Sequence, residues 1–97
     1  MTHTIEIAEF KLADGKTAAE IAASYAGTLA FAQDQKGFIA RTLSCDEGGN
    51  YLDHVEWETM EDASAAGEAF MKDPRNGEFM KCIAPNDISM RHYQKLG

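Results

Sequence analysis

Four short segments of the chain have the hydrophobic pattern of β-strands. The clearest is Tyr51–Glu58, in which apolar and polar side chains alternate as far as Trp57, the single tryptophan of the chain. In Thr4–Lys11 apolar side chains fall on both parities, so we expect a strand that is covered on both faces. The other two predicted strands are Phe38–Cys45 and Ile88–Gln94.

The first predicted helix begins at a capping box. Thr17 is followed three residues later by Glu20, and apolar residues then recur at helical spacing as far as Ala32. We expect this helix to end after a polar run, with Gly37 as its C′ residue.

The second helix is predicted over Met60–Met71, because Thr59 has the acid Asp62 three residues after it. Pro74 disfavours helical backbone at the preceding residue and should end the helix. A further short helical turn is expected within Arg75–Ile83.

The elements follow one another as strand, helix, strand, strand, helix, strand, with a hairpin turn at Asp46–Asn50. This is the order of the split βαβ, or ferredoxin-like, arrangement. It is an α+β fold in which a four-stranded antiparallel sheet carries both helices on one face. We expect residues 1–97 to form a single domain.

The second face of such a sheet would not be cleanly polar in this chain. Whichever parity faces away from the helices carries bulky side chains, such as Ile5 and Ile7 or Phe10, and Leu52 or Val55. An exposed apolar patch of this size marks an interface. Two sheets packed face to face would cover it, so we predict a homodimer.

Composition narrows the range of partners. Sixteen acidic residues against nine basic ones give a net charge of −7, which disfavours nucleic acids and anionic membrane surfaces. No stretch approaches the roughly 20 apolar residues of a membrane-spanning helix, and no signal peptide is expected. We expect a cytoplasmic protein in which Cys45 and Cys82 are buried thiols, with a disulfide or a nucleophilic thiol as the alternatives.

Several short motifs are similar to those of one known family. They are Gly37-Phe38, Tyr51-x-x-His54-Val55-Glu56-Trp57, Phe70-x-x-Asp73-Pro74 before Phe79, and Met90-x-His92-Tyr93. Together they resemble the dimeric α+β-barrel superfamily and, within it, the antibiotic-biosynthesis-monooxygenase-like (ABM-like) branch, over nearly the whole chain. The resemblance implies a ferredoxin-like protomer whose sheet pairs with that of its partner in a barrel. It also implies a small cavity between the sheet and the helices of each protomer.

The resemblance implies a chemistry as well. Several members are monooxygenases without metal or flavin, in which the anion of a phenol- or quinol-like substrate reacts directly with dioxygen, so no cofactor is expected. A dimeric barrel that binds a small ligand without transforming it, and an isomerase- or dehydratase-type reaction, are the alternatives. Haem degradation, found in another branch, is not expected, because Phe10 and Ile83 stand where that branch has its asparagine and histidine.

Candidate site residues follow from this arrangement. The cavity is predicted to be lined by four aromatic residues, Trp57, Phe10, Tyr25 and Phe79. His92 is the candidate catalytic base, because histidine titrates near neutral pH, and an interface or edge histidine is the alternative, since either face of the last strand is possible for it. His54 has the opposite parity to Trp57 and is expected on the dimer face with Leu52. Arg41 is expected in a solvated or interface ion pair, with an anion clamp as the alternative, and no residue spacing predicts a metal site.

Overall fold

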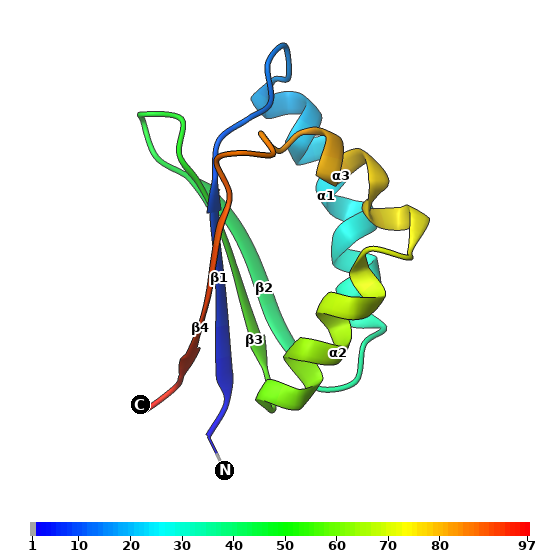
Figure 1. Ribbon diagram of the computed structural model, residues 1–97, viewed down its shortest axis with the longest axis vertical. Helices are drawn as coiled ribbons and strands as arrows, with labels where there is room; N and C mark the ends of the chain where they lie inside the picture. The colour runs from blue at the N-terminus through cyan, green and yellow to red at the C-terminus, as the bar shows by residue number, and fades with distance from the viewer. Residues whose placement is uncertain (1) are drawn as a thin grey trace.

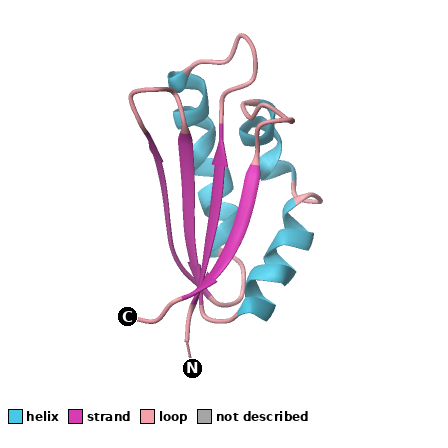
Figure 2. Cartoon of the chain, turned by 60° about the vertical axis from the view of Figure 1, so that its left-hand side comes forward, coloured by secondary structure: helices cyan, strands magenta, loops and turns pink. Residues whose placement is uncertain are grey.

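The chain folds into a sheet with helices on one of its faces. The computed structural model describes residues 2–97, and its two layers are visible in Figure 1. Within these residues the strands are β1 (Thr4–Phe10), β2 (Phe38–Cys45), β3 (Tyr51–Trp57) and β4 (Ser89–Gln94). The helices are α1 (Ala18–Gln33), α2 (Met60–Phe70) and α3 (Gly77–Lys81), with a short 3-10 helix, η1 (Pro74–Asn76), before α3. Figure 2 shows the open face of the sheet, with the helices behind it.

The sheet has the strand order β2-β3-β1-β4, and every neighbouring pair is antiparallel. The predicted α+β class, the four-stranded antiparallel sheet and the placement of the helices on one face are therefore confirmed. The predicted strands and the second helix extend by at most one residue beyond the observed ends. The helical turn expected within Arg75–Ile83 is present as α3, preceded by η1.

The register of the central strand β1 decides which side chains share a face. Glu6 pairs with His92 of β4, and Ala8 pairs with Met90. Directly paired residues point to the same side of a sheet. These pairs line the space between the sheet and the helices, so all four side chains lie on the inner face, which is the face beneath the helices.

The outer face of the sheet follows from the same register. Ile7 of β1 pairs with His54 of β3, and Glu9 pairs with Leu52. Ile5 pairs with Tyr93 of β4, which is 49% exposed. The parity assigned to His54 and Leu52 from the sequence is thus the one that turns away from the helices.

Both predicted helix caps are present. The Thr17 hydroxyl accepts a hydrogen bond from the Glu20 amide, and the Glu20 carboxylate accepts one from the Thr17 amide. Thr59 caps α2 by accepting a hydrogen bond from the Asp62 amide. These side chains satisfy amide groups that have no partner within the first turn of a helix, which is why the caps are readable in the sequence.

The prediction for Gly37 is wrong, because α1 already ends at Gln33. Gly37 lies in the connection to β2 with a φ of +81°. A Cβ added there would meet the Asp62 side chain at 2.1 Å. Glycine is needed at this position because the beginning of α2 lies against it, and not because a helix ends there.

The prediction for the cysteines is half right. Both are free thiols, but Cys45 at the end of β2 is exposed and only Cys82 is buried. None of the helices formed by residues 2–97 is long and apolar enough to cross a membrane.

Candidate functional site

A cavity of about 320 Å³ lies between the inner face of the sheet and the helices. It exists because small side chains stand at facing positions, where larger ones would fill the space. These are Ala8 of β1, Ala32 of α1, and Ala63, Ala66 and Gly67 of α2. Its walls are mostly apolar, and its volume is at the lower end of the range of small-molecule sites.

The cavity interrupts the hydrophobic core. Phe10 and Phe79 belong to one cluster of buried side chains, and Val55 and Trp57 belong to a second. Members of both clusters line the cavity. The core therefore consists of two packed regions, and a space large enough for a small molecule adjoins both of them.

The structure brings most of the predicted site residues together. Trp57, Phe10 and Phe79 all line the cavity, and so does His92. Tyr25 does not; its hydroxyl donates a hydrogen bond of 3.0 Å to the backbone carbonyl of Arg41. A helical stripe that is apolar in the sequence could not reveal this, because the acceptor lies on the next strand, β2, 16 residues further along the chain.

Trp57 is 3% exposed, and its ring packs edge-on against Phe38 with 5.8 Å between the ring centroids. Within residues 2–97, its indole Nε1 is the one buried side-chain nitrogen or oxygen without a hydrogen-bond partner. A buried N–H without an acceptor costs free energy. Trp57 lines the cavity, so this unpaired N–H belongs to a residue of the cavity wall.

The His92 imidazole has an acidic partner in the cavity wall. Its Nε2 lies 3.2 Å from Oε1 of Glu6, and the two side chains are 29% and 18% exposed. Burial raises the pKa of the Glu6 carboxyl above its ordinary value, as does the nearby Asp53, while the contact with His92 lowers it. The contact with Glu6 therefore orients the His92 ring in the cavity wall. The Glu6 carboxyl group, for its part, releases its proton at a higher pH than an exposed glutamate does.

Sequence reasoning missed Glu6 as a site residue. The available signal was its parity. Glu6 points to the same side of the strand as Ala8 and Phe10, and so places a charge on the core side. Buried charges are rare unless they are paired. The partner could not be read, because His92 is 86 residues away in the chain.

The prediction of a solvated or interface ion pair for Arg41 is wrong. Its guanidinium makes a two-point contact with the Asp53 carboxylate, with 3.0 Å from Nε to Oδ1 and 2.6 Å from Nη2 to Oδ2. The two side chains are only 5% and 8% exposed and lie beneath the helices. The Arg41 guanidinium also lies over the rings of Tyr25 and Phe79, at 5.7 and 5.3 Å from their centroids.

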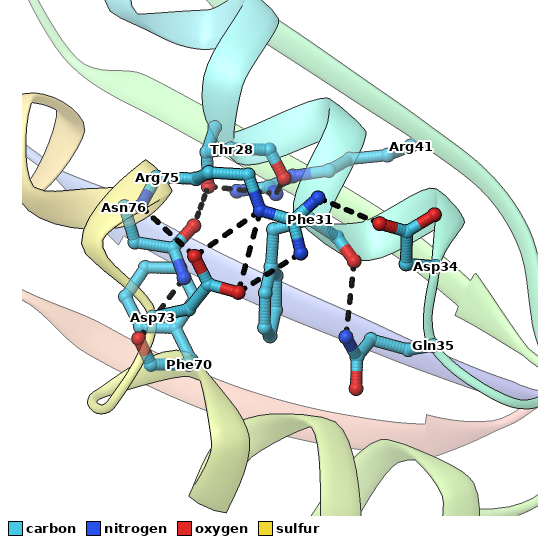
Figure 3. A network of polar contacts seen from close by, with 9 residues as sticks. All are labelled: Thr28, Phe31, Asp34, Gln35, Arg41, Phe70, Asp73, Arg75 and Asn76. Carbon is cyan, nitrogen blue, oxygen red and sulfur yellow. Dashed lines mark hydrogen bonds and ion pairs between the residues drawn. The ribbon is translucent and has the colours of Figure 1, made fainter.

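The same arginine connects the sheet to the helices, as Figure 3 shows. Nη1 of Arg41 donates to the backbone carbonyl of Thr28 at 2.9 Å and to its hydroxyl oxygen at 3.1 Å. The Thr28 hydroxyl donates in turn to Oδ1 of Asn76 at 2.7 Å. Nδ2 of Asn76 then donates to the carbonyl of Phe70 at 2.9 Å. One buried network thus joins β2, β3, α1, η1 and the end of α2.

This network also argues against the alternative of an anion clamp. Four hydrogen bonds already occupy Arg41, and a guanidinium has five N–H groups. Arg41 is a structural cation in the wall of the cavity, and little of its donor capacity is left for a ligand.

Within residues 2–97, no group of three or more His, Cys, Asp or Glu side chains could hold a metal ion. His54 and Leu52 are half-buried on the outer face of the sheet and do not line the cavity. A role for either of them in a dimer interface stays a prediction.

No family model matches the chain, and no curated protein matches its sequence. Its structure, by contrast, is similar to several solved ones. A candidate antibiotic biosynthesis monooxygenase from Bordetella bronchiseptica has a TM-score of 0.83 at 19% identity, over 99% of this chain and 99% of that one. SnoaB, a cofactor-independent oxygenase from Streptomyces nogalater, has a TM-score of 0.77 at 16% identity, over 100% and 96%. A candidate antibiotic biosynthesis monooxygenase from Caulobacter crescentus CB15 has a TM-score of 0.77 at 15% identity, over 99% and 92%.

These similarities extend over the whole chain and have one fold in common. The fold of the ABM-like proteins, which the sequence motifs predicted, is therefore the fold of this chain.

The Arg41–Asp53 pair should be strongly coupled. Either single replacement, Arg41→Met or Asp53→Leu, leaves the other charge buried and unpaired, and should lower the free energy of unfolding by about 3–5 kcal/mol. The double variant should lose clearly less free energy of unfolding than the two single variants lose together. The measurement is urea unfolding of all three variants. Arg75→Met, which breaks the exposed contacts with Asp34 and Asp73, is the control and should cost much less. Strictly additive losses for Arg41 and Asp53 would contradict the coupling.

The pKa of Glu6 should lie above its usual value of 4.5 and should rise further in His92→Phe, because the contact with His92 lowers it. A raised pKa in the folded state means that Glu6 favours folding below its unfolded pKa. That contribution is lost as the pH rises through the folded pKa. Carbon NMR titration of the Glu6 carboxyl measures both values. His54→Phe, on the outer face, is the control and should leave the Glu6 pKa unchanged. A Glu6 pKa that does not respond to His92→Phe would refute the pairing.

Proposed function

We propose that this chain, which has the fold of the ABM-like proteins, is a monooxygenase that needs no cofactor and acts on a small phenol- or quinol-like substrate. One observation carries the proposal. A mostly apolar cavity has in its wall the His92–Glu6 pair and Trp57, whose buried indole N–H has no hydrogen-bond partner. The similarity to SnoaB, a cofactor-independent oxygenase, supports the same chemistry.

His92 is the proton acceptor in this proposal. When Nε2 donates to Glu6, the other ring nitrogen, Nδ1, is the one that can accept a proton from the substrate. The imidazolium that forms is then stabilised by the Glu6 carboxylate. General base catalysis of this kind contributes about 10²–10⁴-fold to a rate.

The substrate anion then reacts with dioxygen, and no other reductant is needed. Transfer of one electron to dioxygen and recombination of the two radicals give a peroxide anion at the substrate carbon. The His92 imidazolium returns its proton to this anion, which becomes a hydroperoxide. Loss of water turns a CH₂ group into a carbonyl group, so that one oxygen atom enters the product and the other leaves as water. The apolar walls exclude bulk water from the intermediate. The Trp57 N–H donates to the substrate oxygen on which negative charge develops.

Oxygen uptake with anthrone as the substrate tests this proposal. The wild type should consume dioxygen faster than the uncatalysed reaction. His92→Ala should be slower by about 10²-fold or more, because it removes the base. Trp57→Phe keeps an aromatic ring but removes the N–H donor, and should be slower by about 10-fold or more. His54→Ala, a histidine replacement on the outer face, is the matched control and should keep the wild-type rate.

A wild-type rate no higher than the uncatalysed one would contradict the monooxygenase proposal. Ligand binding without oxygen consumption would then favour the two alternatives. A binding protein would release its ligand unchanged, whereas an isomerase or dehydratase would return a rearranged or dehydrated product.

We also propose that two copies of the chain pair through the outer face of the sheet. That face carries the half-buried Ile5, Ile7, Leu52 and His54 and the exposed Tyr93. Pairing about a two-fold axis places the same patch of each copy against the other and removes it from water.

Sedimentation velocity at micromolar concentration tests the dimer. The wild type should sediment as a dimer, and Ile7→Glu should sediment as a monomer, because it places a charge in the middle of the paired faces. Ala26→Glu, on an exposed position of α1, is the control and should remain dimeric. A wild type that is monomeric under these conditions would end the proposal.

A further inference from the structure

The charges in the cavity wall do not balance. The ionisable side chains of residues 2–97 that line the cavity are Glu6, Arg41, Asp53 and His92. Arg41 and Asp53 neutralise each other through their two-point contact. The Glu6 carboxylate is left with only His92 as its partner, at 3.2 Å.

No positive charge in the wall is available to a ligand. The Arg41 side chain is 5% exposed and already donates to Asp53 and Thr28. The guanidinium also lies over the rings of Tyr25 and Phe79, at 5.7 and 5.3 Å from their centroids. When His92 is protonated, its charge is paired with Glu6. A bound anion would therefore meet carboxylates without a free cation to offset its charge.

We propose that Glu6 is a specificity-determining residue, which makes the cavity select uncharged aromatic molecules and reject aromatic carboxylates. The inference rests on the proposed function, since it describes the substrate of the same site. It adds the requirement that this substrate enters the cavity without a charge.

The charge of the cavity before and after proton transfer explains why an uncharged substrate suits the site. A neutral phenol that gives its proton to His92 leaves the total charge of the cavity unchanged, and its anion forms beside an imidazolium. A substrate that arrives with a carboxylate adds a further negative charge near Glu6 and Asp53. Charges of like sign repel strongly where water is largely excluded, and burying the carboxylate itself is costly.

The selection applies to groups that lie inside the cavity. Its apolar rim includes Met71, Met90, Ile88 and Met80, which are 73%, 55%, 42% and 37% exposed. A charged group on a long substituent would reach water past this rim. The test therefore needs a probe that is small enough to be wholly enclosed.

2-Naphthamide and 2-naphthoate form such a pair, because they have the same shape and differ in charge. Isothermal titration calorimetry at about pH 8 measures the affinity of each. The wild type should bind the amide at least about tenfold more tightly than the carboxylate, the ratio that corresponds to 1.4 kcal/mol. Glu6→Gln should bring the two affinities to within about threefold of each other, mainly by tightening the carboxylate.

Glu9→Gln is the matched control. It removes a carboxylate from the same strand and changes the net charge equally, but Glu9 is paired with Leu52 on the outer face and contacts Arg91 there. Its selectivity should equal that of the wild type. The single indole N–H signal of the chain, from Trp57, should shift in NMR spectra when the amide binds, which shows that the probe occupies the cavity.

Three results would overturn the proposal. They are equal or tighter binding of the carboxylate by the wild type, no amide binding at millimolar concentration, and an unchanged selectivity in Glu6→Gln. If Glu6→Gln does not fold, Glu6→Thr replaces it, since threonine suits a strand. The assay requires no turnover. A wild type that consumes oxygen but shows no preference for the amide would thus refute only this inference. A wild type that prefers the amide but does not consume oxygen would refute only the monooxygenase.

Discussion

The buried pair of Arg41 and Asp53 is the contact on which the arrangement of sheet and helices depends most. Two charges beneath a helical layer are stable only if their remaining hydrogen-bonding groups are also satisfied. Thr28 supplies both acceptors for the third nitrogen of the guanidinium, and Asn76 accepts from Thr28 in turn. The position of α1 over β2 and the turn at η1 are therefore set by polar geometry as well as by apolar packing.

The same layer also leaves part of the core unfilled. Alanine and glycine on α2 face Ala8 of β1, and the side chains around them cannot close the space. A better-filled core would be more stable, because lost contacts around a cavity cost free energy. The unpartnered indole N–H of Trp57 is a second local departure from good packing. Such departures are expected where a protein binds a ligand.

The central strand β1 separates two uses of one sheet. Toward the helices, Glu6 carries a charge into the cavity opposite His92. Toward the outside, Ile5 and Ile7 contribute to the apolar surface through which we propose that two copies of the chain pair. A shift of the register by one residue would exchange the two faces and destroy both properties.

The sequence by itself determined the elements, their order and the two helix caps, because these depend on residues within a few positions of one another, such as Thr17 and Glu20. It also placed Trp57 and His54 on opposite faces, since alternation is a local property. Only the tertiary structure decided that His92 meets Glu6, that Arg41 is buried against Asp53, that Tyr25 is held by the Arg41 carbonyl and that Cys45 is exposed. The physical reason is that register and helix packing choose partners far apart in the chain, and a pattern of apolar and polar residues does not specify which charged groups will meet.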